Sequence, residues 1–392
     1  MGHEGAVVGR AWDRPVRRVD EVLRRPRLLR VLIVASIVVN IGIVVTGGAV
    51  RLTKSGLGCP TWPRCTGSSL LPTAQQAEHG VIEFSNRTLT FVVSIVAIAT
   101  LLVALRQLRA ADGGGRRRAA LATAIFLGIP AQAVLGGFTV LTDLNPWLVA
   151  GHFLLSMVLI ALTVVLLDVA PPRRQITRTE PAPGTAVSAP LRVIAVTLGW
   201  LICAATAAVL VLGTITTGTG PHAGATNAEG VARRIGLDPQ QITQAHADAV
   251  MVLVGLTVAL LAVLMVAMRL GGPQQAGGTN GVQLVRSTWL LLALEVTQGL
   301  IGFVQYFTGV PPVLVGLHML GACLIWATAI WILLLARRAA AELPGQHRDR
   351  VDQHAHAGTD DRAVDPDELE VTPDLQLEAP AGAGSVPALH RR

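Results

Sequence analysis

The sequence predicts an all-α protein that crosses a membrane with eight helices, arranged as two four-helix bundles in a parallel repeat. Its 392 residues are 51% hydrophobic and only 15% charged. The apolar residues gather in stretches of about 20, the length that crosses a bilayer as a helix. The second half of the chain also repeats patterns of the first. These three observations favour a polytopic membrane protein over a soluble globular domain.

The apolar stretches place the helices in order along the chain. We expect transmembrane helices over residues 30–50, 80–105, 119–141, 147–169, 191–213, 243–268, 285–307 and 313–336. The resulting parts are a basic N-terminus, a first bundle, a linker, a second bundle and a tail, over residues 1–29, 30–170, 171–190, 191–338 and 339–392. The tail is rich in acidic residues and has little apolar periodicity, which predicts disorder.

The positive charges predict the orientation of the helices. The segments 1–30, 106–118, 171–192, 269–286 and 337–338 hold 21 Lys and Arg residues, whereas the opposite loops hold five. Because positively charged loops stay in the cytoplasm, we expect both termini there and the protein in the cell membrane. The net charge of +7 follows from this asymmetry, so we expect no nucleic-acid partner. The first apolar run is too long for a cleavable signal peptide.

An internal repeat relates the two halves. The stretch QAVLGGFTVLTDLNPWLVAGH ends at His152, and QGLIGFVQYFTGVPPVLVGLH ends at His318, 166 residues later. The same offset carries VTGG of 45–48 onto VLGT of 211–214. Because each unit has an even number of spans, the halves share one orientation, which is a parallel repeat. We therefore expect two similar pockets, one in each bundle.

Histidines within the apolar spans indicate a cofactor site. His246, at the start of the second helix of its half, and His318, on the fourth, are expected to face each other near the outer surface. An intramembrane histidine serves in a proton relay, an interhelical hydrogen bond or metal binding. Two facing imidazoles suit the axial ligation of a haem between helices. A zinc site is less favoured because no third ligand cluster accompanies them.

Carboxylates within the spans form a second set of candidates. In the first half, Asn86 stands where a histidine is expected, with Glu83 one turn before it and Arg87 beside it. This segment is either a reactive polar cluster or a helix end whose charges neutralise one another. In the second half, Glu295 lies within a span, and we expect it to pair with Gln298 on the next turn in a packing role.

The motifs together resemble the haem A synthase family, membrane enzymes that convert haem O to haem A for cytochrome oxidase. The resemblance covers residues 30–338 and rests on TGGAVRLTKSGLGCPTWPRC, EFSNR, the two stretches that end in histidine, TGTGPHAG and QAHAD. It implies an oxidoreductase that hydroxylates one porphyrin methyl group successively, until the hydrated aldehyde loses water and leaves a formyl group. Haem O synthase and cytochrome oxidase assembly factors are the protein partners that the resemblance suggests.

The resemblance also implies roles for individual residues. His246 and His318 would ligate the iron of a permanent haem b, and His152 would bind the iron of the substrate haem. The Glu83–Arg87 segment would line the substrate-haem site. From its position beside Arg87 within the span, and not from the resemblance, we expect Glu83 to be the catalytic residue, as a general base or as a group that stabilises an intermediate. Many members of the family have a histidine where this chain has Asn86, so His152 alone, water or Asn86 are the alternatives for completing the ligation.

Residues near the outer surface complete the expected substrate-haem site. Arg51, Arg87 and His222 lie where haem propionates would emerge, and guanidinium groups suit carboxylates. Interfacial anchoring is an equally good explanation for Arg51. Cys59 and Cys65 lie in an outer loop, where either a disulfide or free thiols fit the spacing. The resemblance favours the disulfide.

Two other classes of function explain part of the sequence. A di-haem cytochrome b that only transfers electrons would account for the histidines, but not for the carboxylate beside Asn86. A transporter with parallel repeats would account for the duplication, yet such proteins have helices broken near mid-membrane. Here Pro146 and Pro312 lie between the spans instead. Extraction of the bound pigment would distinguish the three classes.

Overall fold

A computed structural model describes residues 23, 25–74, 77–108, 113–170, 188–221, 223, 233–275 and 278–341. This part of the chain holds eight helices long and apolar enough to cross a membrane, and no strand. The eight helices are α2 Pro26–Leu52, α3 Ala77–Arg106, α4 Gly115–Leu141, α5 Pro146–Val169, α6 Ser188–Thr219, α7 Pro239–Gln275, α8 Gly278–Phe307 and α9 Pro312–Ala341. The predicted all-α class with eight spans is confirmed.

The terminal segments contribute little to this description. By its internal contacts the chain divides into Met1–Leu343 and Pro344–Arg392. The second unit lies wholly outside the described residues, as do most of the predicted N-terminus, the predicted linker and the histidine-containing part of the TGTGPHAG loop. The expectations for these segments stay predictions.

The observed helices contain the apolar stretches and extend beyond them. Helix α7 has 37 residues, whereas the apolar pattern predicts a helix only over 243–268. A search for apolar residues finds only the part of a helix that lies in the hydrocarbon core of the membrane. Backbone N–H and C=O groups beyond that core also need hydrogen-bond partners, so the helix continues into the polar residues on either side. Pro146 and Pro312 begin α5 and α9, where a missing backbone N–H removes no helical hydrogen bond.

The sequence repeat is also a structural repeat. In the turn before α5, the backbone N–H of Leu144 donates to Thr139 O, and in the turn before α9 that of Val310 donates to Gln305 O, both over 2.8 Å. Leu144 and Val310 both have positive φ values, 56° and 60°. Each residue of the first turn lies 166 positions before its counterpart. The two turns therefore enter α5 and α9 with the same geometry.

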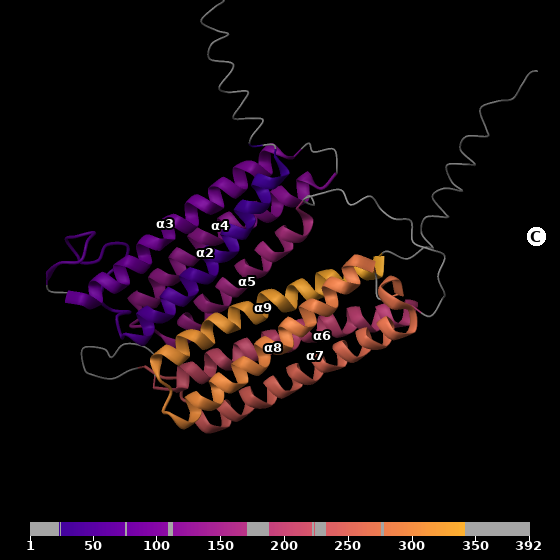
Figure 1. The fold of residues 1–392 in the computed structure, drawn as a ribbon. Helices are drawn as coiled ribbons and strands as arrows, with labels where there is room; N and C mark the ends of the chain where they lie inside the picture. Colours follow the sequence, from indigo (N-terminus) through magenta and orange to yellow (C-terminus); the bar gives the residue numbers. More distant parts are fainter. Residues whose placement is uncertain are drawn as a thin grey trace, which may run out of the picture. The chain divides into compact units, whose positions relative to one another are not determined.

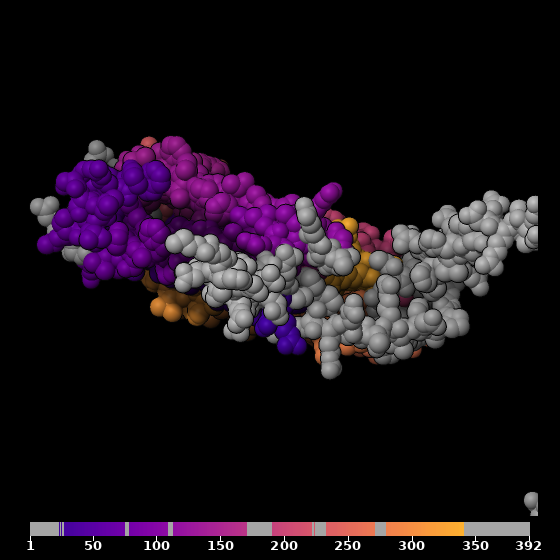
Figure 2. Space-filling model, turned by 90° about the horizontal axis from the view of Figure 1, so that it is seen from above, coloured from indigo at the N-terminus to yellow at the C-terminus, as the bar shows by residue number. Residues whose placement is uncertain are grey.

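Each half of the described chain closes into a four-helix bundle (Figure 1). In the first half α2 and α4 each contact α3 and α5, and in the second half α6 and α8 each contact α7 and α9. The halves meet through α5 with α9, α2 with α9, and α5 with α6. Exchanging every helix for its repeat equivalent leaves this set of contacts unchanged, as an approximate two-fold axis requires. In Figure 2, residues of α2–α5 cover much of the visible face.

Polar contacts between the halves show that they run in the same direction. Arg51, at the end of α2, donates to Thr217 O, near the end of the equivalent helix α6, over 3.5 Å. Asp168 and Arg338, near the ends of the equivalent helices α5 and α9, form an ion pair of 2.7 Å. We call the end of the bundles at Thr217 the loop end and the end at Arg338 the terminal end.

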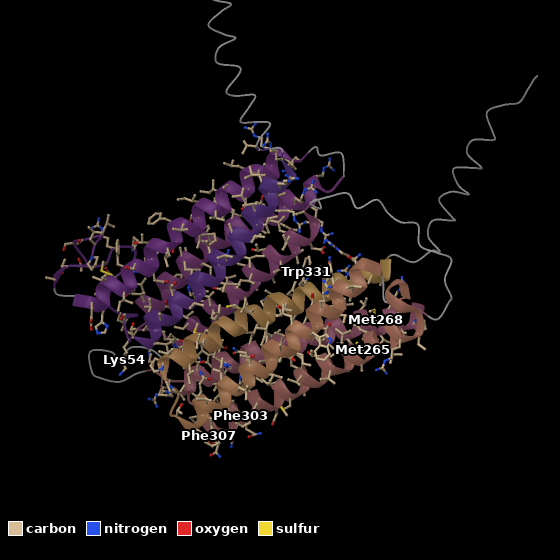
Figure 3. All side chains as sticks on the ribbon, in the orientation of Figure 1. Lys54, Met265, Met268, Phe303, Phe307 and Trp331 are labelled. Atoms are coloured by element: carbon tan, nitrogen blue, oxygen red, sulfur yellow. A yellow bond between two sulfur atoms is a disulfide. The ribbon has the colours of Figure 1, made fainter. Side chains whose placement is uncertain are left out.

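An apolar core separates these two ends. Trp326 of α9 packs in this core and donates its Nε1–H to Met157 O of α5 over 2.8 Å. Figure 3 labels Lys54 and Phe307 near the loop end and Trp331 toward the terminal end. The buried residues of the core between the halves are Ile41, Val44, Met157, Ile160, Leu210 and Cys323.

Candidate functional site

Two histidines of the second half face each other near the loop end. The ring centroids of His246 on α7 and His318 on α9 are 6.5 Å apart, and the ring planes are inclined by 64°. In both rings Nδ1 is buried without a hydrogen-bond partner in the described part of the chain. Glycines of the adjacent helices lie beside them: a Cβ added to Gly213 would lie 3.1 Å from Cε1 of His246, and one added to Gly302 would lie 3.9 Å from Cε1 of His318.

The first half places two other side chains against equivalent glycines. A Cβ added to Gly136 of α4 would lie 3.1 Å from Cε1 of His152, and one added to Gly47 of α2 would lie 3.8 Å from Nδ2 of Asn86. These glycines are 166 residues before the two of the second half. His152 and Asn86 therefore occupy the places that the two histidines hold in the second half.

Polar side chains of neighbouring helices bind the side chain of Asn86 but only the backbone of His152. Thr46 of α2 donates its hydroxyl to Asn86 Oδ1 over 2.7 Å. Gln132 of α4 donates to the backbone carbonyl of His152 over 3.1 Å and to Ser156 Oγ over 2.7 Å, but not to the imidazole. The Nδ1 atom of His152 is buried without a partner among the described residues. The amide oxygen of Asn86 is thus already engaged, whereas the ring of His152 is not.

Glu83 is held in place on both of its carboxylate oxygens. Its side chain is buried, with the residue 5% exposed. Oε2 accepts the backbone N–H of Cys59 over 2.6 Å, and Oε1 accepts from Arg87, one turn later on α3, over 2.5 Å from Nη2 and 3.2 Å from Nε. This geometry fixes the carboxylate and places a compensating positive charge beside it.

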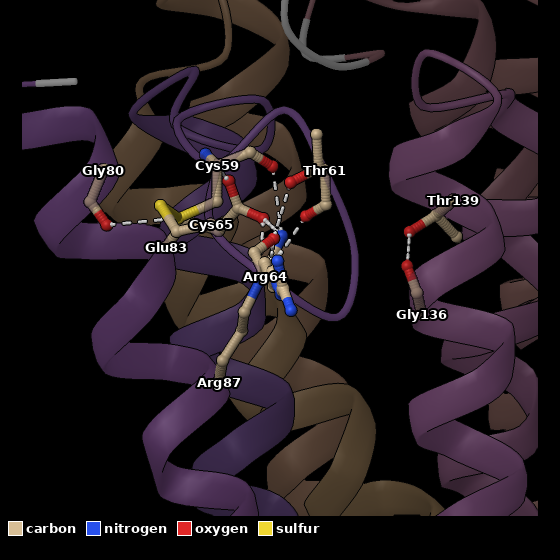
Figure 4. Close-up of polar contacts among 9 residues, drawn as sticks. All are labelled: Cys59, Thr61, Arg64, Cys65, Gly80, Glu83, Arg87, Gly136 and Thr139. Atoms are coloured by element: carbon tan, nitrogen blue, oxygen red, sulfur yellow. Dashed lines mark hydrogen bonds and ion pairs between the residues drawn. A yellow bond between two sulfur atoms is a disulfide. The ribbon is translucent and has the colours of Figure 1, made fainter. Parts of the chain in front are cut away.

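The loop that follows α2 is closed by a disulfide and surrounds Arg87 (Figure 4). Cys59 and Cys65 are fully buried and joined by an S–S bond of 2.01 Å. Arg87 donates to the carbonyls of Cys59 (3.1 Å), Thr61 (3.1 Å) and Arg64 (3.4 Å). The closed loop and the Glu83–Arg87 pair therefore form one hydrogen-bonded unit at the loop end of the first bundle.

Arg51 lies between the halves and not inside the first bundle. Its Nη2 donates to Ala223 O over 2.9 Å as well as to Thr217 O. Both acceptors belong to the second half. His222, expected in the same region, lies outside the described residues.

The prediction that Glu295 pairs with Gln298 is wrong. Glu295 is 2% exposed and accepts the hydroxyl of Thr257 of α7 over 2.8 Å. Gln298 packs instead against Gly321 of α9. Residues three apart share a helix face, but the neighbouring helix places a hydroxyl closer to the carboxylate than its own helix places an amide.

The facing histidines fit a haem iron. Imidazole nitrogens bind a metal at about 2 Å, and the ring centre lies about 1 Å further away, so two imidazoles on opposite sides of one metal have centroids roughly 6 Å apart. The observed 6.5 Å between His246 and His318 agrees with this value. Their buried, unpartnered nitrogens also suit ligation. In the described part of the chain, no group of three or more His, Cys, Asp or Glu residues is placed to hold a metal ion, so a zinc ligand set is not present there.

Comparison with known proteins places the chain in a family. The model of the family COX15-CtaA, described as cytochrome oxidase assembly protein, matches residues 30–227. The chain belongs to this family. Residues matched by the family model include the first bundle, the linker and the first helix of the second bundle.

Curated relatives in this family are similar to the chain over part of its length. The heme A synthase of Lysinibacillus sphaericus is 34% identical over 145 residues, 37% of this chain and 45% of the relative. That of Exiguobacterium sibiricum is 33% identical over 131 residues, 32% of this chain and 42% of the relative. That of Geobacillus thermodenitrificans is 32% identical over 163 residues, 38% of this chain and 46% of the relative. The chain spans less than half the length of these relatives.

Some residues around the candidate site are not evident from the sequence. Thr46, the donor to Asn86, lies 40 residues away in the chain. Trp62 of the disulfide loop packs against α4, where a Cβ added to Gly137 would lie 2.6 Å from the indole ring. The sequence repeat could have indicated Thr46, because Leu212 stands at the equivalent position of the second half. A polar residue in one half whose repeat equivalent is apolar indicates a place where the surroundings of the candidate ligands differ between the halves.

Proposed function

We propose that this protein is a haem A synthase, an oxidoreductase that converts a methyl group of haem O to a formyl group and so supplies haem A for cytochrome oxidase. One observation carries the proposal: the two halves hold side chains in equivalent places, but the second half presents the facing His246 and His318, whereas the first presents His152 and Asn86. The fixed carboxylate of Glu83 lies one helical turn before Asn86. Membership of the family and the names of the curated relatives support the same activity. An electron-transfer protein has no need of this asymmetry.

The second half is the cofactor half in this proposal. His246 and His318 would hold a haem b, and their facing rings support this ligand pair. When bound, the haem supplies one-electron redox chemistry. The protein contributes the two ligands, the glycines that admit them and an apolar surrounding.

The first half is the substrate half. His152 binds the iron of haem O through its unpartnered imidazole. Asn86 leaves the opposite side without a protein ligand, because its carbonyl oxygen already accepts from Thr46. His152 is then the single protein ligand, which makes binding weaker than in a site with two imidazoles and lets product leave.

Glu83 is the catalytic residue of the proposed reaction. Each oxidation of the methyl group removes protons as well as electrons, and a carboxylate beside the ring accepts a proton or stabilises positive charge on the reacting carbon. The Cys59 N–H and Arg87 keep the carboxylate in one position. Arg87 and Arg51 are the proposed partners of the haem propionates at the loop end.

The loop end faces the outside of the cell in this proposal, and both termini lie in the cytoplasm. The positive charges concentrate at the terminal end, as the positive-inside rule requires. An oxidising exterior also suits the disulfide between Cys59 and Cys65. The proposed protein partners are those that deliver haem O and receive haem A.

The test is to supply the purified protein, or cells that express it, with haem O and to extract the pigments. The proposal expects haem A or its hydroxylated precursor together with haem b. Recovery of haem b alone would favour the di-haem electron-transfer protein. A preparation that binds no haem would favour transport or a packing role for the histidines.

A further inference from the structure

A half-buried arginine at the terminal end of the second half has two nitrogens without a hydrogen-bond partner in the described part of the chain. Arg192 of α6 lines a cavity of about 20 Å³ between α6, α7, α8 and α9. Its Nε and Nη1 atoms are buried and lack a hydrogen-bond partner among the described residues. A charged side chain at a helix end ordinarily extends to water. These two nitrogens do not, so they have lost water without gaining an acceptor among the described residues.

The side chains that line the cavity supply no acceptor for these two nitrogens. Arg192 is the only charged residue among the nine that line it, and the others are alanine, leucine and valine. Four of them are alanines from three helices, Ala195, Ala267, Ala336 and Ala339. The small side chains leave the space in front of the guanidinium, and a buried charge that stays unpaired is strongly disfavoured.

The first half also holds a buried arginine near its terminal end, but this arginine has an acceptor. Arg118, on α4, is 1% exposed and donates to Val169 O at the end of α5. The repeat equivalent of Arg118 is Leu284, which lines the cavity of the second half. A buried arginine of the first half therefore has an acceptor within the protein, whereas Arg192 faces a space.

The surroundings of the cavity indicate an anion from the membrane. Arg269, Arg286 and Arg337 are exposed and lie one or two residues beyond lining residues of α7, α8 and α9. Helix ends of this kind lie at the level of lipid head groups, and basic pockets between transmembrane helices bind anionic lipids there. A cavity of about 20 Å³ has room for about one water-sized group. One phosphate oxygen fits it, with the rest of the head group among the exposed arginines.

We propose that Arg192 and its alanine-lined cavity bind the phosphate group of an anionic phospholipid. The guanidinium group donates from one of its unpartnered nitrogens, Nε or Nη1, to a phosphate oxygen, which makes a charge-assisted hydrogen bond. The apolar faces of the surrounding helices accommodate the acyl chains. The site lies at the opposite end of the bundle from His246 and His318 and is independent of the reaction.

The test measures lipid binding by the full-length protein in detergent. Native mass spectrometry counts the phosphatidylglycerol retained, and thermal melting is followed with added phosphatidylglycerol, phosphatidylcholine or inorganic phosphate. Arg192→Gln should weaken phosphatidylglycerol binding about tenfold or more, since a charge-assisted hydrogen bond is lost. The control Arg116→Gln removes an exposed charge at the terminal end of the first half, away from the cavity, and should change binding far less.

A second variant keeps the charge and removes the space. Ala336→Leu fills the cavity and should also abolish the melting increase caused by phosphatidylglycerol, in protein that remains monodisperse on gel filtration. Equal losses in Arg192→Gln and Arg116→Gln would mean a diffuse charge effect and would overturn the proposal. So would an equal melting increase with inorganic phosphate, which would assign the cavity to a free anion, or with phosphatidylcholine.

Discussion

The two halves of this chain carry side chains in equivalent places but give them different chemistry. In the second half, His246 and His318 face each other from α7 and α9. In the first half, His152 keeps one of these places and Asn86 takes the other. The common frame comes from the glycines and turns that repeat at a fixed offset, so it constrains where a ligand is held and not which residue holds it.

The difference extends to the neighbours of that one position. Aligning Asn86 with His246 places Thr243 opposite Glu83 and Ala247 opposite Arg87. The ion pair that binds the disulfide loop thus has no counterpart in the second half. A duplicated bundle can divide its tasks in this way, because a ligand can be given up in one half while a fixed carboxylate is added beside it.

The largest expected effect breaks the cofactor half. His246→Ala or His318→Ala should each remove the low-spin haem b absorption, because one imidazole alone leaves the iron under-ligated in a site shaped for two. Absorption and electron paramagnetic resonance spectra of the purified protein measure this. His79→Ala is the control, since His79 is exposed and bonds Ser55. Unchanged spectra in both ligand variants would sink the assignment.

The next effect separates the halves. Glu83→Gln keeps the shape of the side chain but removes its charge, so haem A formation should fall by about 10²-fold or more, with haem b retained and an alcohol intermediate accumulating. Pigment extraction after feeding with haem O measures it. Glu295→Gln is the matched control, a buried carboxylate of the second half, and should leave product formation near the wild-type rate. Normal turnover in Glu83→Gln would reduce Glu83 to a structural ion pair.

Asn86→His should make the first half resemble the second. The new imidazole faces His152, so bound haem O should show the low-spin spectrum of two histidine ligands, and it should leave the protein more slowly. Electron paramagnetic resonance with and without haem O measures the change. A spectrum with no new low-spin signal would mean that Asn86 does not occupy the place of His246.

Breaking the disulfide should have a moderate effect. Cys59→Ser removes the closure of a short loop, which lowers the free energy of unfolding by about 2 kcal/mol, and it loosens the contacts of Glu83 and Arg87 while haem b stays bound. Chemical denaturation and haem b absorption measure the two effects. Cys65→Ser should behave identically, because either change removes the same bond. Full alkylation of both thiols in protein purified without reductant would show that no disulfide exists in solution.

The smallest effect compares two glycines. A Cβ at Gly213 would lie 3.1 Å from His246, which must move by a few tenths of an ångström, whereas one at Gly302 would lie 3.9 Å from His318, an ordinary contact. Gly213→Ala should therefore shift the low-spin haem b spectrum slightly, and Gly302→Ala should not. Equal shifts in both variants would place the histidines differently from this structure.

The sequence by itself determined the eight spans, the duplication and the equivalence of His152 and His318 in the repeat. Each depends on local or periodic information: apolar length for the spans, a constant offset for the repeat. The offset fails for the second helix of each half, where His246 follows Asn86 by 160 residues (246 − 86) and not 166. The loop after α2 is longer than the loop after α6, so the constant offset does not align these helices. The packing against Gly47 and Gly213 supports the expected correspondence of Asn86 with His246.

The tertiary structure alone decided which groups meet across helices. It placed the backbone N–H of Cys59 on Glu83, the hydroxyl of Thr257 on Glu295 and the guanidinium group of Arg51 on carbonyls of the other half. A periodic pattern gives the face of a helix, but a contact between helices also depends on their rotation, depth and neighbours. Those quantities are set by the packing of the whole bundle, and no single stretch of sequence contains them.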